Sequence, residues 1–567
     1  MTSPPPPSAR ALARLFADER EFTWREDPLT ATAEGVRTYD DRLPDVTPDA
    51  QARRCAADED FLRRLHDIDR ASLTPQEQVS YDLFEFLIGS RVTLARYGEW
   101  RLPFNSDSGF FTELLQLDAL AAPQTAKEYA DYIARLHDVP RYFDENIANA
   151  RSGMRDGFTL PAAVLDGVST IIAAAQCKAP EDSPLWRPFA GLRDRVPESD
   201  RIRLKEAGKA ALATAVIPAY AAFQRFFERE YRPAARSTIG CSALPDGRAY
   251  YADLVRYFTT LPDAVPDTIH RNGVAEVARI RAEMEAIVRD VKFAGSFAEF
   301  LAFLRSDPRF YAKTADGLLR EAAWICKEID GKLPRYFGRL PRMPYHVEPV
   351  PVALAPNYTA GRYNPGPIGA AGEYWVNTHA VETRALYALP ALTLHEAVPG
   401  HHLQIALARE LTDLPRFRLN FYPHAFGEGW ALYTEKLGEE MDMYHTPYER
   451  FGRLAYEMWR ACRLVIDTGI HAMEWTREDA LEYLASNTAL SKHEVRTEVD
   501  RYISWPGQAL AYKIGELEIV ALRKQAEARL DGRLDLRAFH DAILENGGVT
   551  LPILARQIDA YVVRAST

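Results

Sequence analysis

Apolar residues recur at helical spacing over most of the chain, with charged residues between them. The pattern runs from residue 8 to about 335 and returns from about 384 to the C-terminus, as in YDLFEFLIGSRVTLARY. Apolar positions three and four residues apart form one stripe along a helix, which is typical of helices that pack on a core. We therefore predict a mainly α-helical protein.

Residues 341–380 interrupt this pattern. The segment PRMPYHVEPVPVALAPNYTAGRYNPGPIGAAGEYWVNTHA is rich in Pro and Gly and contains short runs of β-branched and aromatic residues. Such runs, bounded by turn-forming residues, are typical of strands. Residues 373–378 are the best strand candidate. A small β-sheet is therefore predicted near residues 345–380, inside a helical protein.

The length of 567 residues exceeds that of most single-core domains. We expect a two-lobed protein with an N-terminal helical lobe at 1–235, a helical connecting region at 236–340 and a catalytic lobe at 341–567. Ligand sites often lie between lobes. A deep cleft is therefore expected where the early helices face residues 370–515.

Composition narrows the range of partners. Hydrophobic residues make up 47% and charged residues 26% of the chain, as in folded globular proteins, and the formal net charge is −11. Nucleic-acid binding depends on Lys and Arg, so a nucleic-acid partner is not expected. The five cysteines form no CxxC pair, and the sequence shows neither a leader pattern nor a long apolar run. We expect a cytoplasmic protein without a membrane partner, and the oligomeric state stays open.

The segment His395-Glu396-Ala397-Val398-Pro399-Gly400-His401-His402 carries the strongest chemical signal. In an HExxH helix, two imidazoles four residues apart reach one zinc ion, and the Glu between them acts on its water. Here Pro399 occupies the place of the second histidine. It would interrupt a helix, because it has no N–H and its ring clashes with the preceding turn.

Two histidines compete for the second ligand position. In a regular helix His401 lies about 120° away from the face of His395, whereas His402 returns to that face about 10 Å further along. A distortion at Pro399-Gly400 that absorbs two residues would bring His401 to the metal and leave His402 beside it. We favour His401. The alternative is an ordinary helix end with solvated histidines.

A third ligand is predicted downstream, in Gly427-Glu428-Gly429-Trp430-Ala431-Leu432-Tyr433-Thr434-Glu435. Two histidines and one carboxylate, here Glu428, leave a fourth position for water on a catalytic zinc ion. Glu435 lies two turns further along the same face. It is expected to support a ligand rather than to be one.

These two segments resemble the bacterial family known as domain of unknown function 885, because the first looks like its HExxPGHxxQ signature, from His395 to Gln404. Residues 467–471 and 505–515 extend the resemblance, which spans most of the chain. The family is placed with zincin-like peptidases, and its helical fold is similar to those of carboxypeptidase Taq, thimet oligopeptidase and angiotensin-converting enzyme. The resemblance implies zinc, peptide hydrolysis and His401 as a ligand.

We therefore expect Glu396 to act as the general base on a zinc-activated water. Tyr512 and His471 are candidates for the donor that stabilises the oxyanion. Arg460 and Arg463 could clamp a substrate carboxylate, but a salt bridge from Arg463 to Asp467 is favoured. The strand at 373–378 could pair with an extended peptide as an exposed edge. The residues expected to contact the substrate are Tyr374, Asn377, Gln404, Arg463, Arg501, Tyr502 and Lys513.

Three functions remain open at this stage. The first is a zinc carboxypeptidase, dipeptidase or oligopeptidase acting on short peptides. The second keeps the zinc but acts on a small amide or ester, because the same attack by water serves any acyl group. The third is an inactive helical binding protein of the same fold, which the intact Glu396 argues against.

Overall fold

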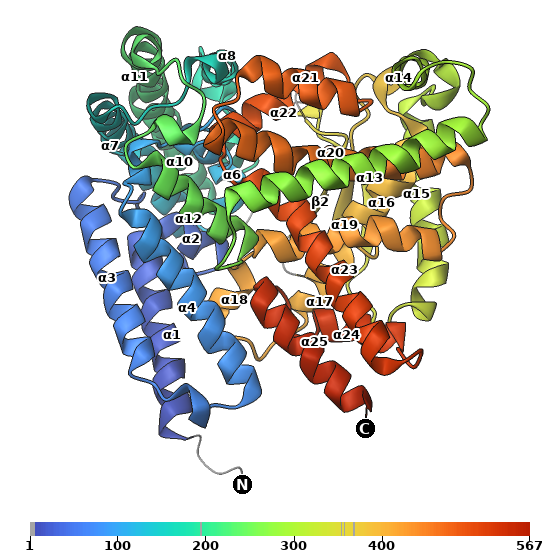
Figure 1. The fold of residues 1–567 in the computed structure, drawn as a ribbon. Helices are drawn as coiled ribbons and strands as arrows, with labels where there is room; N and C mark the ends of the chain where they lie inside the picture. The colour runs from blue at the N-terminus through green and yellow to red at the C-terminus, as the bar shows by residue number, and fades with distance from the viewer. Residues whose placement is uncertain (1–5, 193–195, 353, 356–357, 367–368, 567) are drawn as a thin grey trace. The chain divides into compact units, whose positions relative to one another are not determined.

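The computed structural model describes residues 6–192, 196–352, 354–355, 358–366 and 369–566. The fold is mainly helical with one small sheet, as the sequence predicts. The chain forms two compact units (Figure 1). Unit 1 is Met1–Tyr250 with Ile503–Trp505, and unit 2 is Tyr251–Tyr502 with Pro506–Thr567. The main boundary between the two units therefore lies after Tyr250, inside the predicted connecting region 236–340.

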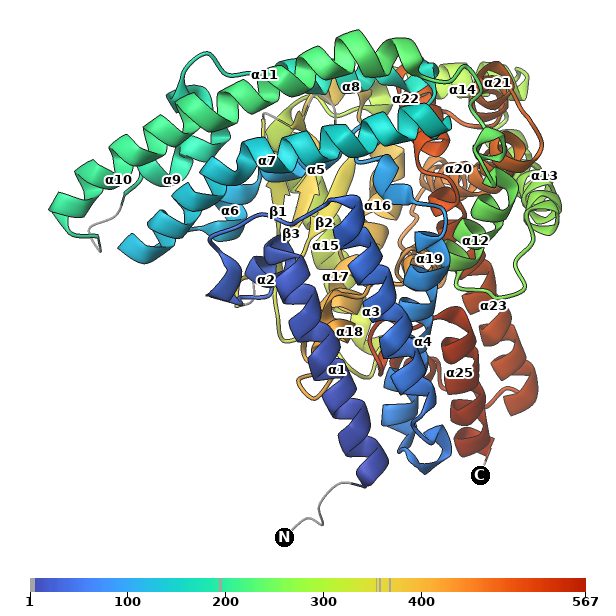
Figure 2. The same cartoon turned by 90° about the vertical axis from the view of Figure 1, so that its left-hand side faces the viewer.

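In the described part of unit 1, the regular elements are helices. The antiparallel helices α1, α3 and α4 lie side by side, and α7 lies along α10 and α11 (Figures 1 and 2). Its helices are α1 (Pro7–Glu26), α2 (Pro28–Ala33), α3 (Pro48–His66), α4 (Pro75–Ala95), α5 (Phe110–Leu114), α6 (Leu117–Ala121), α7 (Ala126–Asp156), α8 (Leu165–Ala174), α9 (Arg187–Ala190), α10 (Glu198–Ala211), α11 (Ile217–Phe226) and the start of α12 (Gly247–Thr259).

The core of unit 1 is aromatic where α5, α7 and α11 meet. Phe110 and Phe143 pack edge to face at 4.9 Å, and Phe223 joins both rings. Edge-to-face pairs bring the positive rim of one ring to the negative face of another, which adds to the burial of apolar area. Local signals also fix the helix starts. Thr125 and Glu128 form a reciprocal capping box at the start of α7.

Unit 2 holds the predicted site. Helix α13 runs along α20, and α19 runs along α23 (Figure 1). Its helices are the rest of α12, α13 (Pro266–Asp290), α14 (Phe297–Ser306), α15 (Ala315–Lys332), α16 (Leu389–Glu396), α17 (His401–Arg409), α18 (Arg416–Asn420), α19 (His424–Glu440), α20 (Pro447–Ala472), α21 (Arg477–Asn487), α22 (Lys492–Ser504, its end in unit 1), α23 (Ala511–Leu530), α24 (Leu536–Leu544) and α25 (Leu551–Ser566).

The sheet has three strands, β1 (Tyr345–Pro349), β2 (Gly361–Asn364) and β3 (Gly372–Val376), in the order β1-β3-β2. β1 is parallel to β3, and β2 is antiparallel to it. The best strand candidate of the sequence is thus β3, but it is the central strand and has no free edge. Its predicted role as an edge for substrate is wrong, and the outer strand β2 is the one that lies against α16.

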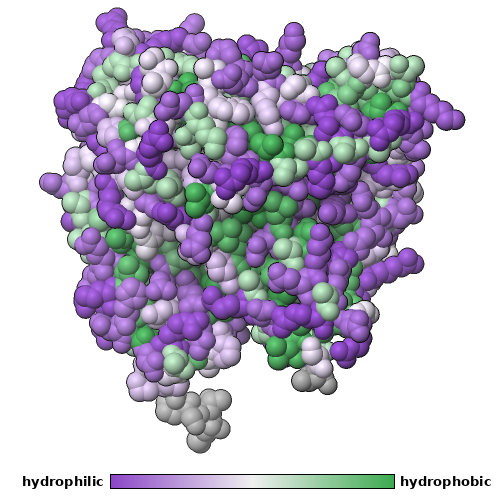
Figure 3. Space-filling view, viewed as in Figure 1, coloured by the Kyte–Doolittle hydropathy of each residue, from purple (hydrophilic) through white to green (hydrophobic). Residues whose placement is uncertain are grey.

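The face drawn in Figure 3 is mainly hydrophilic, with apolar side chains gathered in smaller patches. Among the described residues, one helical stretch, residues 198–234, is long and apolar enough to cross a membrane by composition. Half of its apolar window is buried inside the protein, as in many core helices of globular proteins, so it is weak evidence for a membrane span.

Candidate metal centre

Helix α16 ends at Glu396 and α17 begins at His401, so the predicted break at Pro399-Gly400 is present. The Val398–Pro399 peptide is cis. The His402 N–H donates to the carbonyl of Ala397, five residues earlier, at 3.0 Å. The chain therefore takes up extra residues in one bend between the two helices.

Gly400 lets this bend close tightly. A Cβ at Gly400 would lie 2.0 Å from the carbonyl oxygen of His395, so no other residue fits without a shift of backbone. The bend is also held from outside, because the indole N–H of Trp430 donates to the carbonyl of Pro399 at 2.9 Å. The sequence Pro-Gly thus brings His401 back over the last turn of α16.

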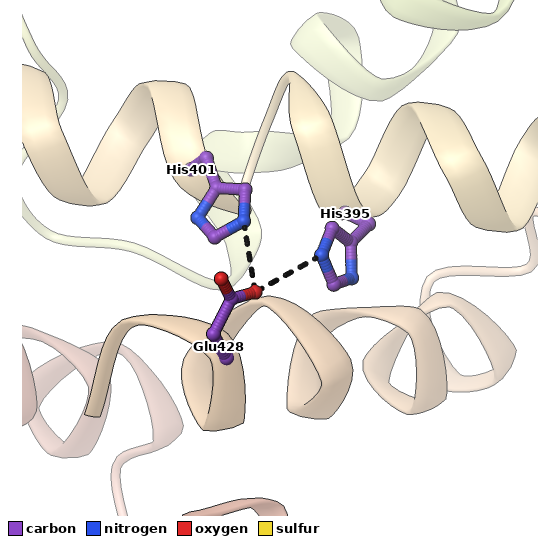
Figure 4. Close-up of side chains that lie close together, drawn as sticks. All are labelled: His395, His401 and Glu428. Carbon is purple, nitrogen blue, oxygen red and sulfur yellow. Dashed lines mark ion pairs between the residues drawn. The ribbon is translucent and has the colours of Figure 1, made fainter. Parts of the chain in front are cut away.

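The bend brings three predicted ligands together, as Figure 4 shows. His395 ends α16, His401 begins α17, and Glu428 lies on α19. Their ligand atoms all lie within 4.8 Å of one another. Glu428 Oε2 is 3.7 Å from His395 Nε2 and 3.4 Å from His401 Nε2. We call these three residues the triad.

The triad has the electrostatic character of a cation site. Burial opposes a charge on His395, but the carboxylates of Glu428 and Glu435 outweigh it and raise the pKa of this imidazole to about 10. Burial would raise the pKa of Glu428, yet the two imidazoles beside it hold this pKa well below its usual range. A buried carboxylate surrounded in this way favours a proton or a metal ion between the groups.

Glu435 orients the first histidine, as the sequence suggests. Its Oε1 lies 2.8 Å from His395 Nδ1, on the side of the ring away from Glu428. A carboxylate on the outer nitrogen fixes the tautomer of a metal-binding imidazole and makes it more basic. Arg460 stands behind Glu435, with Nη2 3.8 Å from the same oxygen.

His402 points elsewhere. Its Nδ1 lies 2.9 Å from the hydroxyl of Tyr363, and its ring packs 4.5 Å from that of Tyr345. Burial lowers the pKa of this imidazole to about 4. The geometry therefore groups His401, and not His402, with the other two ligands.

Glu396 lies beside the triad and is held by strand β2. The backbone N–H of Tyr363 donates to Glu396 Oε2 at 2.8 Å, which leaves Oε1 as a further acceptor. Glu396 also interacts electrostatically with His395. Tyr422 interacts with both Glu396 and Glu428, so its phenol belongs to the same neighbourhood.

Four of the other predicted residues form a cluster. Arg463 Nε donates to the hydroxyl of Tyr502 at 3.1 Å, and its guanidinium lies 4.3 Å from the centre of the Tyr512 ring. Glu498 is 3.0 Å from Arg463 Nη2 and 3.8 Å from Arg501 Nη1. Tyr512 also interacts with Tyr422. Of the two predicted oxyanion donors, Tyr512 thus lies near the triad.

His471 and Lys513 are held by contacts inside the protein. His471 is fully buried, and its Nε2 lies 2.9 Å from the carbonyl oxygen of Tyr502. Lys513 is fully buried among three carboxylates. The predicted Arg463–Asp467 bridge is also wrong, because Asp467 accepts hydrogen bonds from the Tyr251 hydroxyl and the Gly507 N–H instead.

Four of the expected substrate contacts have internal positions. Tyr374 is fully buried, with its hydroxyl 3.3 Å from that of Thr393. Asn377 is fully buried too and donates from Nδ2 to the carbonyls of Ala355, Tyr358 and Thr359, which holds the loop before β2. Tyr502 is 1% exposed, and its hydroxyl accepts a hydrogen bond from Arg463. Gln404 is buried on α17, one turn after His401, and its Oε1 has no hydrogen-bond partner among the described residues.

Three residues that the structure brings close to the triad are not among the predicted site residues. They are Arg362 and Tyr363 on β2 and Tyr422 just before α19. The only signal in the sequence is their place in aromatic segments next to the predicted strand and the predicted ligand. Which of them faces the triad depends on strand order and register.

The comparisons with known proteins agree with this picture at the level of family and fold. A family model described as "Bacterial protein of unknown function (DUF885)" matches residues 28–558. A solved structure titled "putative lipoprotein" from Colwellia psychrerythraea is similar at 28% identity with a TM-score of 0.90, covering 98% of this chain and 99% of that one. A second, titled "putative lipoprotein of unknown function" from Shewanella oneidensis, shares the fold at 17% identity with a TM-score of 0.76, covering 97% and 99%.

No curated protein matches the chain. The family model covers nearly the whole sequence, including both segments of the triad. The chain therefore belongs to the DUF885 family of bacterial proteins of unknown function.

Proposed function

We propose that the protein is a zinc-dependent peptidase that hydrolyses short peptides. One observation carries the proposal: the ligand atoms of His395, His401 and Glu428 converge within 4.8 Å, with Glu396 next to them in sequence. Two imidazoles and one carboxylate match the donor set of catalytic zinc sites that keep a position for water.

The residues present suit a zinc ion. Both imidazoles present Nε2 to the same carboxylate oxygen. The outer nitrogen of His395 is bonded to Glu435, as is usual for a metal-binding histidine. Softer thiolate ligands are absent from this group, and among the described residues it is the only His, Cys, Asp and Glu cluster with such spacing.

A bound zinc ion would polarise a substrate carbonyl and acidify a water molecule. Glu396 is the group of this chain suited to take the proton of that water. The Tyr363 N–H fixes one of its carboxylate oxygens at 2.8 Å and leaves the other available. A base held in one orientation needs no rearrangement when the proton moves, and it can pass that proton to the leaving amine.

Tyr512 is the proposed donor to the oxygen that becomes negative. Arg463 lies over its ring at 4.3 Å and fixes its position. A hydroxyl near a guanidinium donates more readily to an anion than an isolated one does. The outer strand β2, which holds Glu396, offers an edge along which an extended peptide backbone could align.

The test compares the wild-type protein with Glu396→Gln on a library of short peptides, after both are loaded with zinc. We expect cleavage by the wild type and a loss of about 10²–10⁴-fold in the variant, the usual contribution of a general base. Glu439→Gln is the matched control, since this exposed glutamate lies on the far end of α19. Full activity of Glu396→Gln would contradict the assigned role, and the products would show which chain end is attacked.

A cytoplasmic location stays a prediction. The two solved relatives carry the word lipoprotein in their titles. Fractionation of cells that produce the full-length protein would test the location separately from the activity.

A further inference from the structure

Arg362 occupies a distinctive place on the outer strand β2. It directly precedes Tyr363, whose N–H holds Glu396, and it pairs in register with Trp375 of β3. Arg362 is solvent-exposed, whereas the residues on either side of it, Gly361 and Tyr363, are buried. The strand thus presents one arginine to solvent next to the carboxylate that is the proposed base.

The other arginines near the triad are already paired with carboxylates. Arg460 faces Glu435, and Arg463 and Arg501 share Glu498. In contrast, no carboxylate oxygen of the described residues lies within 4.0 Å of the Arg362 guanidinium. Its charge is therefore available to a bound ligand.

The neighbours of Arg362 define what that ligand can be. Its charge interacts with the phenols of Tyr358 and Tyr512 and with Glu396. Glu396 is held by Tyr363 and repels anions from its own position. A ligand that uses Arg362 must therefore carry its negative group beside the bond that is cleaved and not at it, with the Tyr358 phenol able to donate to the same group.

We propose that Arg362, assisted by the hydroxyl of Tyr358, forms a subsite for a carboxylate of the substrate. A guanidinium offers two parallel N–H donors that match the two oxygens of a carboxylate. The inference rests on the proposed function and makes it narrower. The substrates are peptides with a carboxylate close to the bond that is cleaved, either the free chain end or an acidic side chain.

The experiment measures binding rather than turnover. Zinc-loaded Glu396→Gln protein is titrated with Ala-Xaa-Ala tripeptides, each as the free acid and as the C-terminal amide, and with amidated tripeptides that end in Glu. We expect the free acids, or the Glu amides, to bind about ten- to a hundredfold more tightly than the neutral amides. The two arms distinguish a terminal carboxylate from a side-chain one.

Adding Arg362→Met to the Glu396→Gln protein should abolish this preference, so that acids and neutral amides bind with the same affinity. Arg362→Lys keeps the charge but not the two-pronged donor and should restore part of the preference. The control is Arg320→Met, which removes the same charge from an exposed arginine on α15 that is paired with Asp316. Equal binding of acids and amides by the parent, a preference unchanged by Arg362→Met, or no binding of any acid would overturn the inference.

The outcomes separate this inference from the proposed function. Cleavage of peptides by the zinc-loaded wild type, without a preference that depends on Arg362, would refute the carboxylate subsite alone. A preference that depends on Arg362 in a protein that cleaves no peptide would refute the peptidase function and leave the subsite in place.

Discussion

Two buried polar clusters of unit 2 differ in how their charges are balanced. The first is the ion network of Lys513, Arg279 and Arg453 with Glu276, Glu457 and Glu516. Lys513 Nζ lies 3.0 Å from Glu276, 2.8 Å from Glu457 and 2.7 Å from Glu516. Arg279 and Arg453 add further pairs with Glu457. Each of the three glutamates therefore faces a Lys or an Arg. Arg279 and Arg453 also pair with Glu283, and Arg453 pairs with Glu439, at the edge of the network.

The second cluster is the triad. It joins two imidazoles to Glu428, with Glu435 and Glu396 beside them, and no Lys or Arg forms an ion pair with Glu428 within the described part of the chain. Within the described part of the chain, Glu428 thus faces imidazoles alone, whereas Arg460 lies 3.8 Å from Glu435. Burial and ionic contacts alone do not mark a functional site, but a buried carboxylate that faces imidazoles and no Lys or Arg does.

The largest expected effect comes from breaking the ion network. Lys513→Met leaves buried glutamates without their central cation, and removing one partner of a buried ion pair costs about 3–5 kcal/mol. We expect the free energy of unfolding in urea to fall by about that amount, with an unchanged metal content per folded molecule. Lys327→Met, at an exposed ion pair with Asp330, should change stability by less than about 1 kcal/mol. Equal stability of both variants would refute the contrast.

Gly400→Ala should damage the triad through the backbone. Its Cβ would lie 2.0 Å from the carbonyl oxygen of His395, so the bend must open, at a cost of about 1–3 kcal/mol for overpacking. We expect lower thermal stability together with weaker zinc binding, since His401 moves with the bend. Gly331→Ala on α15 has nothing within 4 Å of its new Cβ and should not destabilise the protein. Unchanged zinc binding in Gly400→Ala would show that the bend does not position His401.

Glu435→Gln should act on the metal with little effect on the fold. The amide keeps the shape of the side chain but loses the charge that orients His395, and such outer partners contribute about ten- to a hundredfold in metal affinity. Competition with a chelator would measure the change. Glu440→Gln, on the same helix and paired with Arg523, is the control. Equal zinc affinity of both variants would show that Glu435 has only a structural role, like the glutamates of the ion network.

Local chemistry explains what could be predicted from the sequence. The helical pattern, the strand at 373–378 and the break at Pro399-Gly400 follow from residues that are close together in the chain. Pro lacks an N–H, and Gly allows a close approach of backbone, so the break requires no knowledge of the rest of the fold. The preference for His401 over His402 follows from the same local argument, whereas the choice of Glu428 rests on the donor set of a catalytic zinc ion.

Long-range pairing explains what could not be predicted. β3 has a strand-like sequence, but its central place in the sheet depends on β1 and β2. The sequence of residues 373–378 alone does not show which strand forms the edge of the sheet. Arg463 and Lys513 have the residue types of a substrate site, yet their partners Glu498 and Glu457 are 35 and 56 residues away. Arg362 was missed because only the strand register shows that it stands beside Glu396.

The proposed metal site is tested most directly by the zinc content of three purified proteins, the wild type, His401→Ala and His402→Ala, measured by elemental analysis after zinc loading and dialysis. We expect stoichiometric zinc in the wild type and in His402→Ala, because His402 bonds to Tyr363, and a loss of zinc in His401→Ala. Stoichiometric zinc in His401→Ala, or a loss confined to His402→Ala, would refute the triad as the zinc site.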